Sequence, residues 1–210
     1  NGKLPGNAVL TDAGSAKGSV IAAVQQAFGR IPGNFVPGHP IAGIEQSGVQ
    51  AALPDLFHNR RVILTPLPET DSTAIARVRT MWEAAGATVR EMEAAHHDEV
   101  LAATSHLPHV VAFALVESLA RLHDKQEIFD YAAGGFRDFT RIASSDPVMW
   151  RDICLANGDA ILAMIDRFTT GLQTLADAVR ERDGDKLLEM FSTAKDARDK
   201  YVDSQTQEGK

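Results

Sequence analysis

The chain has 210 residues, of which 44% are hydrophobic and 23% charged, and this composition is typical of a soluble globular protein with one large or two modest domains. The net charge of −7 and the lack of a lysine or arginine run argue against a nucleic-acid partner and against binding to an anionic membrane. No uninterrupted apolar stretch reaches the roughly 18 residues that cross a bilayer. Because Cys154 is the single cysteine, no internal disulfide can form and a cytoplasmic location fits best.

Residues 8–92 alternate between predicted strands and helices. Buried runs predict strands at residues 8–12, 35–36, 61–65 and 88–92, and apolar residues at helical spacing predict helices at about 15–28 and 71–85. Ser15 is placed to cap the first of these helices. Such alternation is typical of a parallel α/β sheet. Because no Gly-x-Gly-x-x-Gly motif occurs in the chain, we expect only the C-terminal half of a doubly wound, Rossmann-like domain over residues 1–93.

From residue 94 onward the sequence predicts only helices. They are expected at residues 95–104, 108–123, 147–156, 158–182 and 184–201. The helix after His106 is apolar on more than one side, which is typical of a helix buried in a bundle or at a subunit interface. We therefore expect an all-helical domain over residues 94–202, followed by a polar, frayed tail at 203–210.

His39 is the first candidate for chemistry. It lies between Pro37 and Pro40, directly after a short buried strand, and is therefore expected on a stiff loop at a strand's C-terminal end, where ligands bind in open α/β sheets. Ser15 follows another strand end and could face the same crevice, either as a nucleophile beside a base or as a group that positions a substrate hydroxyl. Glu45, six residues after His39, could orient the imidazole. An ordinary turn histidine and a plain helix cap would show the same pattern.

Four histidines fall between residues 96 and 109. His106 and His109 are three residues apart and could share a helix face, although Pro108 disturbs the local geometry. No cysteine or glutamate stands at the spacing of a zinc protease, so no metal site is predicted. Capping or core roles are expected for at least two of the four, and one or two could line a polar pocket.

A glycine-rich stretch starting at Gly134 leads into Arg137 and Arg141 and then into a helix that carries Trp150. Arginine is the usual bidentate partner of a carboxylate, so this stretch is a candidate for binding an acidic ligand. Alternatively, both arginines form surface ion pairs with nearby aspartates, which contribute about 1 kcal/mol or less.

Several motifs together resemble those of the prephenate/arogenate dehydrogenase family of tyrosine biosynthesis, in the same order and over residues 8–200. The motifs are Asp12-Ala13-Gly14-Ser15-Ala16-Lys17-Gly18, Gly38-His39-Pro40-Ile41-Ala42-Gly43, Ile63-Leu64-Thr65-Pro66, Ser105-His106-Leu107-Pro108-His109, Phe139-Thr140-Arg141-Ile142-Ala143, Asp146-Pro147 and Met149-Trp150-Arg151-Asp152.

The resemblance implies an activity and a catalytic pair. Members of the family oxidatively decarboxylate prephenate to 4-hydroxyphenylpyruvate, or arogenate to tyrosine, while NAD or NADP accepts a hydride. His39 matches the histidine that takes the proton of the substrate's ring hydroxyl, a task that suits an imidazole. Ser15 matches the serine that holds this hydroxyl and the nicotinamide, and Gly14 lies beside it at the cofactor.

The resemblance also implies six substrate-binding residues. They are Arg141 for a substrate carboxylate, His109 and Trp150 around the substrate side chain, Gly134 in an adjoining loop, and Glu45 and His97 in a polar network with the arginine near the entrance.

The implied architecture is a partial Rossmann-like domain followed by a helical domain that forms a homodimer, with tyrosine as an inhibitor. Since the family's nucleotide-binding glycines have no counterpart here, the chain is expected to lack the N-terminal dinucleotide-binding segment, to bind NAD weakly and to be poorly active by itself. Two alternatives remain open at this point. One is a different hydroxyacid dehydrogenase, and the other is a non-catalytic helical module for dimerisation or tyrosine binding.

Overall fold

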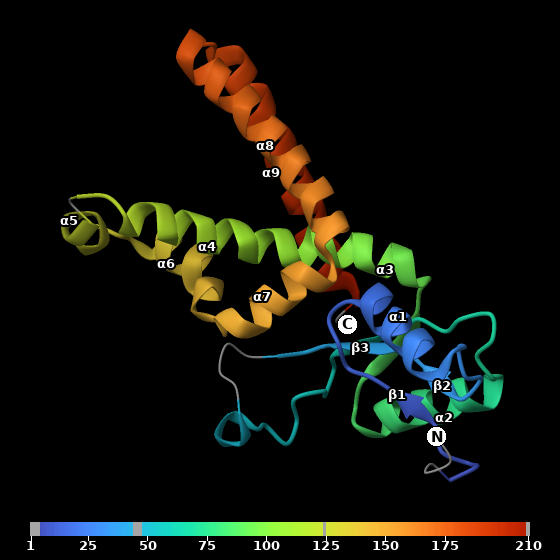
Figure 1. The fold of residues 1–210 in the computed structure, drawn as a ribbon. Coiled ribbons are helices and arrows are strands. Elements are labelled where there is room, and N and C mark those ends of the chain that lie inside the picture. The colour runs from blue at the N-terminus through green and yellow to red at the C-terminus, as the bar shows by residue number, and fades with distance from the viewer. Residues whose placement is uncertain (1–4, 44–47, 124, 209–210) are drawn as a thin grey trace. The chain divides into compact units, whose positions relative to one another are not determined.

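The computed structural model describes residues 5–43, 48–123 and 125–208 (Figure 1). Internal contacts divide the chain into two compact units, residues 1–162 and 163–210. The first unit carries both sheets and the helices up to α7, and the second consists of most of α8 together with α9. An α/β part followed by a helical part confirms the predicted fold class.

The strands form two small sheets. β1 (Leu10–Thr11) pairs in parallel with β2 (Phe35–Val36). The second sheet has the order β3 (Gly38–Ile41), β4 (Arg61–Leu64), β5 (Thr88–Glu91). β4 and β5 are parallel, as predicted, but β3 runs antiparallel to β4. Parallel pairing needs a crossover connection, whereas the described part of the β3–β4 connection holds only the 3-10 turn Val49–Ala51.

The prediction that His39 lies on a loop is wrong. His39 and Pro40 belong to β3 and pair with Ile63 and Val62 of β4. A proline is tolerated there because β3 is an edge strand of its sheet, where a missing backbone donor breaks no interior ladder. His39 is therefore held by a hydrogen-bonded strand, which restricts its backbone more than a loop would.

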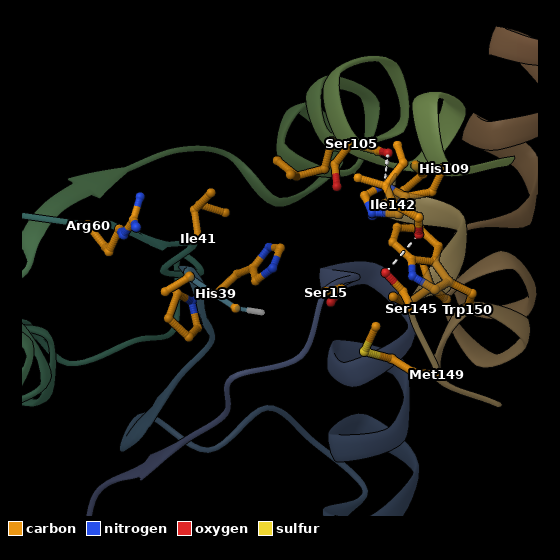
Figure 2. A pocket seen from close by; sticks show the side chains of 16 residues that line it. Ser15, His39, Ile41, Arg60, Ser105, His109, Ile142, Ser145, Met149 and Trp150 are labelled. Atoms are coloured by element: carbon orange, nitrogen blue, oxygen red, sulfur yellow. Dashed lines mark hydrogen bonds between the residues drawn. The ribbon is translucent and has the colours of Figure 1, made fainter. Parts of the chain in front are cut away.

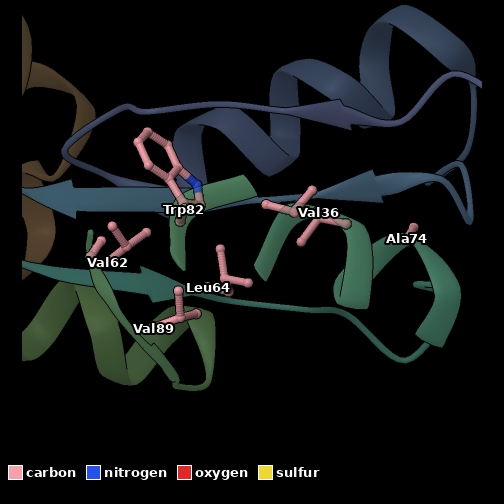
Figure 3. Close-up of a cluster of buried hydrophobic side chains, with 8 residues drawn as sticks. Val36, Val62, Leu64, Ala74, Trp82 and Val89 are labelled. Carbon is pink, nitrogen blue, oxygen red and sulfur yellow. The ribbon is translucent and has the colours of Figure 1, made fainter. Parts of the chain in front are cut away.

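The hydrophobic core of the α/β part lies between the sheet and α2 (Ser72–Ala84), as Figure 3 shows. Val62 and Leu64 of β4 are fully buried against α2 residues that include Trp82, whose ring meets Phe57 edge-on at a centroid distance of 5.0 Å. Each large apolar side chain buried in this way contributes about 1.5–3 kcal/mol. The core thus fixes β4, and β4 in turn fixes the strand that carries His39.

Helix α1 (Lys17–Phe28) shows that the prediction of Ser15 as a helix cap is wrong. The N-cap residue is Ala16, which makes no side-chain capping bond. Asp98, from helix α3 (Ala94–Leu101), caps α1 instead: its two carboxylate oxygens accept the backbone N–H groups of Lys17 and Gly18, each at 2.8 Å. A carboxylate at a helix N-terminus satisfies free donors and the helix dipole together. Ser15 is left free to face the neighbouring pocket.

Helix α3, the π-helical turn Ala102–His106 and α4 (Leu107–Ala120) form one continuous helix, where two separate helices were predicted. The π turn inserts an extra residue and is the kind of distortion that often occurs at functional sites. By length and composition alone, the 27 residues Ala94–Ala120 could cross a membrane, which the count of uninterrupted apolar residues did not indicate. One such helix is weak evidence, because the core helix of a soluble protein passes the same test.

The remaining helical segments are α5 (Lys125–Asp130), α6 (Gly134–Thr140), the 3-10 turn Arg141–Ser144, α7 (Pro147–Ala156), α8 (Gly158–Glu181) and α9 (Gly184–Glu208). Of these, α7, α8 and α9 begin where the sequence pattern predicts, whereas α5 and α6 were not predicted and Gly134 starts a helix where a loop was expected. Asp146 caps α7 by accepting the N–H of Val148 at 2.8 Å, as the Asp-Pro pair predicts. The predicted frayed tail is wrong for residues 203–208, which continue α9.

Candidate active site

A pocket of about 390 Å³ lies within the first unit, where the end of β3 meets the loop after β1, the α3–α4 helix and α7 (Figure 2). This volume lies within the roughly 300–1,000 Å³ typical of small-molecule sites. The lining residues are Ser15, His39, Pro40, Ile41, Ala42, Gly43, Arg60, Leu101, Ser105, His106, His109, Ile142, Ser145, Met149, Trp150 and Ile153. The pocket therefore brings together four of the residues predicted from the sequence, namely Ser15, His39, His109 and Trp150.

His39 occupies the strand side of the pocket. Its side chain is 8% exposed, and Figure 2 shows the ring projecting from β3 toward the space that Ser15 also lines. Burial, followed by the proximity of His97 and Lys17, lowers the pKa of His39 to about 3. The imidazole is therefore neutral at physiological pH and can accept a proton from a hydroxyl group.

Two residues stand behind His39 in a chain of hydrogen bonds. His39 Nδ1 lies 2.9 Å from His97 Nε2, and His97 Nδ1 lies 2.8 Å from Asp98 Oδ1. His97 is wholly buried, so it lies behind the pocket wall and not near the entrance, where the resemblance implied it. Although burial by itself raises the pKa of Asp98, the hydrogen bonds from His97 and from the first turn of α1 hold that pKa below its usual value.

A buried ion pair fixes the backbone next to His39. The Lys17 side chain has no exposed surface, and its ammonium pairs with Asp12 and donates to the carbonyl oxygen of Gly38 at 2.6 Å. Asp12 also accepts the backbone N–H groups of Gly38, at 3.0 Å, and Gly14, at 2.8 Å. Burial lowers the pKa of Lys17, while Asp12 opposes this shift. The pair thus connects the end of β1, the start of α1 and the start of β3.

The helical side of the pocket presents aromatic and polar groups. His109 stacks on Trp150 with ring centroids 3.8 Å apart, and its Nδ1 donates to the carbonyl oxygen of Ser105 at 2.9 Å. His106 accepts a hydrogen bond at Nδ1 from Asn157 at 3.1 Å. Burial lowers the pKa of His106 to about 4 and also lowers that of His109. Both rings are therefore neutral near pH 7.

Trp150 supplies an unused donor. Its indole Nε1 is buried and has no hydrogen-bond partner among the described residues. A buried donor without a partner costs about 1–3 kcal/mol, and a bound ligand with an acceptor at this point would recover that energy.

The other predicted site residues that the structure describes do not line the pocket. Gly14 precedes Ser15 but does not line the pocket. Arg141 is exposed and begins the 3-10 turn whose next residue, Ile142, lines the pocket, and Gly134 is exposed at the start of α6. Glu45 lies outside the described residues. Substrate-binding roles for these residues stay predictions.

The sequence reasoning missed several residues that build the site. They are Lys17 and Asp98 behind His39, and Arg60, Ser105, His106 and Ser145 in the pocket wall. Ser105 and His106 belong to a motif that was recognised, and the His97-Asp98 pair was visible as adjacent polar residues. Arg60 gave no signal, because nothing in the local sequence separates it from the arginine that follows.

The residues at the start of α1 define where a nucleotide could lie. Among residues 5–43, 48–123 and 125–208, no group of three or more metal-ligating side chains is close enough to hold an ion. The N-terminus of α1, which in nucleotide-binding folds often meets a phosphate, is taken up by Asp98. Gly14 and Ser15 follow β1 at the sheet edge where such folds bind ligands, and an added Cβ at Gly14 would lie 3.1 Å from an Asp12 oxygen. Ser15 at this edge lines the pocket, whereas Gly14 does not.

An α/β nucleotide-binding part, a helical part and a buried neutral histidine in the pocket together indicate an oxidoreductase of the dehydrogenase class. Two family descriptions match the chain: "prephenate dehydrogenase, nucleotide-binding domain" over residues 2–91 and "prephenate dehydrogenase, dimerization domain" over residues 93–193. The chain is 42% identical over 198 residues to the cyclohexadienyl dehydrogenase of Zymomonas mobilis, covering 93% of this chain and 67% of that protein. The chain belongs to the prephenate dehydrogenase family.

Further relatives agree with this assignment. The prephenate dehydrogenase of Bacillus subtilis is 41% identical over 197 residues, which are 91% of this chain and 52% of that protein. The chain thus spans about two thirds of one curated relative and about half of another. Because the nucleotide-binding description matches from residue 2, the comparison does not support the expectation that the dinucleotide-binding segment is missing.

Solved structures show the same fold. The prephenate dehydrogenase of Aquifex aeolicus, determined in complex with hydroxyphenyl propionate and NAD+, superposes with a TM-score of 0.86 at 40% identity, covering 94% of this chain and 68% of that one. The arogenate dehydrogenase of Synechocystis superposes with a TM-score of 0.78 at 29% identity, over 92% of this chain and 69% of that one.

Proposed function

We propose that this protein is an NAD-dependent prephenate dehydrogenase that oxidatively decarboxylates prephenate to 4-hydroxyphenylpyruvate in tyrosine biosynthesis. The observation that carries the proposal is His39, a buried neutral imidazole that faces the Ser15 side of a pocket of about 390 Å³. The names of the relatives and of the solved structures support the same reaction.

His39 and Ser15 act on the ring hydroxyl of the substrate. Ser15 orients the hydroxyl, and the free ring nitrogen of His39 accepts the hydroxyl proton. At the same time the ring carbon that bears the hydroxyl loses a hydride. NAD supplies the hydride acceptor, and loss of the ring carboxylate as carbon dioxide completes the aromatic ring. Burial of His39 keeps the imidazole unprotonated before the substrate arrives. A dianionic substrate nearby raises the pKa of His39 toward the range in which it can take a proton.

The other predicted residues hold the substrate. We assign a carboxylate-binding role to Arg141, contacts with the substrate side chain to His109 and Trp150, and neighbouring positions to Gly134 and Glu45. The unpartnered indole N–H of Trp150 supports its role, since a substrate oxygen would give that donor an acceptor.

We infer the cofactor, the inhibitor and the oligomeric state from the family to which the chain belongs. Gly14 and Ser15 hold the nicotinamide, and NADP is kept as an alternative to NAD. We expect tyrosine to inhibit, the protein to be cytoplasmic, and residues 94–202 to form a homodimer. Exposed apolar side chains on α8 and α9, including Phe168, Leu172 and Phe191, support a protein partner for these helices.

The test compares the protein with its His39→Asn and His96→Gln variants. The formation of reduced nicotinamide is followed with prephenate and with arogenate, and with NAD and NADP. We expect His39→Asn to lower kcat by roughly 10²–10⁴-fold with substrate binding retained, since it removes the base. His96 is an exposed neighbour on α3, so His96→Gln should keep the activity.

No turnover by the protein with either substrate and either nucleotide, despite intact folding, would contradict the proposal. In that case binding of tyrosine without redox chemistry would favour a helical binding module, and turnover of another hydroxyacid would favour a different dehydrogenase. The weak activity expected from the missing glycine motif stays a prediction that the same assay checks.

A further inference from the structure

The hydrogen bonds behind His39 determine which of its nitrogens carries a proton, because they start from a group that can only accept. Both carboxylate oxygens of Asp98 already accept backbone N–H groups, from Lys17 to Oδ1 and from Gly18 to Oδ2, each at 2.8 Å. The ionised carboxylate has no proton to give. The contact of 2.8 Å between Asp98 Oδ1 and His97 Nδ1 therefore has His97 as the donor.

The next contact follows from the first. A neutral histidine has one N–H and one lone pair, so His97 with a proton on Nδ1 presents the lone pair of Nε2 to His39. The distance of 2.9 Å between His97 Nε2 and His39 Nδ1 then requires His39 to donate. The rings meet edge-on, with an interplanar angle of 66° and centroids 5.1 Å apart, as an in-plane N–H directed at the neighbouring ring requires.

We propose that His97, neutral and anchored by Asp98, is a positioning residue that locks His39 in the Nδ1–H form, so that the unprotonated Nε2 is presented to the substrate hydroxyl. The inference rests on the proposed function for its catalytic consequence, but the tautomer itself can be measured without any turnover. In a free histidine side chain the proton prefers Nε2, and in that form the pocket would meet a donor where the reaction needs an acceptor.

The lock also fixes where the proton goes. The O–H bond of the substrate would break, the proton would bind His39 Nε2, and the electron pair left on oxygen would form a ring carbonyl as the hydride leaves for the nicotinamide. When carbon dioxide then departs, the electrons of the broken C–C bond make the ring aromatic, and the oxygen regains a proton to give the phenol of the product. The imidazolium that results keeps its Nδ1–H bonded to His97. The negative charge of Asp98 stabilises this cation, since it is the charge near His39 that favours the protonated ring.

Burial explains why the hydrogen bonds that link His39, His97 and Asp98 are rigid. His97 is wholly buried, and the Asp98 side chain is only 13% exposed, so water does not compete for either bond. Asp98 is held by the first turn of α1, a helix of 12 residues. His97 is the residue before Asp98 in α3, so the same contact restricts its position. His39, held in β3, is thereby tied to two helices that come from distant parts of the sequence.

The first test is nitrogen NMR of protein labelled with ¹⁵N-histidine, at a pH slightly above neutral. The signals of His39 are assigned from their loss in His39→Asn. We expect a protonated Nδ1 and an unprotonated Nε2 for His39, and the same form for His97. A His39 with its proton on Nε2, or a His97 protonated on both nitrogens, would overturn the proposal.

The second test uses variants of His97. His97→Leu removes the acceptor, so His39 should return to mostly Nε2–H, and kcat should fall by roughly 10–100-fold, as for other residues that orient a functional histidine, with KM little changed. His97→Gln retains an acceptor oxygen and should recover part of the rate. His96→Gln, the exposed neighbour, is the matched control. Unchanged kcat in a folded His97→Leu would refute the positioning role.

The outcomes separate the two proposals. If the protein turns over prephenate but His39 carries its proton on Nε2, the lock is wrong and the dehydrogenase assignment stands. If His39 is locked in the Nδ1–H form but no substrate is oxidised, the tautomer inference stands and the proposed function fails. If His97→Leu does not fold, the NMR measurement on the unsubstituted protein and the His97→Gln kinetics still decide the question.

Discussion

Replacing Asp12 by asparagine is expected to destabilise the protein strongly near neutral pH and much less in mild alkali. The substitution removes the negative charge that pairs with the Lys17 ammonium, which has no exposed surface and also donates to the Gly38 carbonyl. Leaving one member of a buried ion pair without its counter-charge typically costs about 3–5 kcal/mol.

The size of the loss is limited by deprotonation of the lysine. Removing a proton at pH 7 from a group with an ordinary pKa of about 10.4 costs about 4.6 kcal/mol, and this cost falls by about 1.4 kcal/mol for each pH unit above 7. As the pH rises, deprotonation becomes cheaper than burying the unpaired charge, and the folded variant then holds a neutral Lys17 while the unfolded chain holds a charged one. Because the unfolded state binds more protons, the stability of the variant rises with pH. By pH 9 the cost of deprotonation has fallen to about 1.8 kcal/mol, which becomes the upper limit of the loss.

Urea unfolding at pH 7, 8 and 9, followed by the fluorescence of the two tryptophans at one protein concentration, measures this effect relative to the unsubstituted protein. The double variant Asp12→Asn with Lys17→Met removes both charges and should show no such pH dependence. Lys17→Met alone should cost less, about 1–3 kcal/mol, because Asp12 retains two backbone donors and 19% exposure. An Asp12→Asn loss that is equal at pH 7 and pH 9 would refute the reasoning.

Two further predictions concern stability. Burial lowers the pKa values of His39 and His106, so as the pH falls the unfolded chain takes up protons before the folded protein does. The contribution of these two histidines to the free energy of unfolding is complete above about pH 6.5. It falls by up to about 1.4 kcal/mol per pH unit for each histidine as the pH drops toward 4. Urea unfolding at pH 6.5 and 5 checks this, and equal stability would contradict it. Gly86→Ala should cost about 1–3 kcal/mol, because Gly86 has a φ of 84° and the new Cβ would lie 2.7 Å from His58 Nδ1. Gly135→Ala, with nothing within 4 Å of its Cβ, is the control in thermal melts, and equal melting temperatures would contradict the prediction.

Local signals in the chain were sufficient for most of the helices. The apolar spacing of α2 and α7 and the Asp146-Pro147 start of α7 act within a few residues, so they could be recognised without any tertiary information. The direction of a strand, unlike the position of a helix, could not be predicted from local sequence. β3 and β4 pair antiparallel because of the path taken by the connection between them, and no local pattern in β3 records that path.

The candidate site divides in the same way. His39, Ser15, His109 and Trp150 could be chosen from residue type and motif, and all four line the pocket. The sequence alone thus determined the α/β-then-helical order, the family resemblance and the residues that carry the chemistry.

The tertiary structure alone decided how those residues are prepared for their roles. Asp98 caps a helix that begins 81 residues earlier in the chain, and His97 reaches His39 across 58 residues. Hydrogen bonds and burial act between atoms that are close in space, whereas a sequence pattern records only neighbours along the chain. The lowered pKa of His39, the buried Lys17–Asp12 pair and the hydrogen bonds behind the histidine therefore become visible only when the chain is folded.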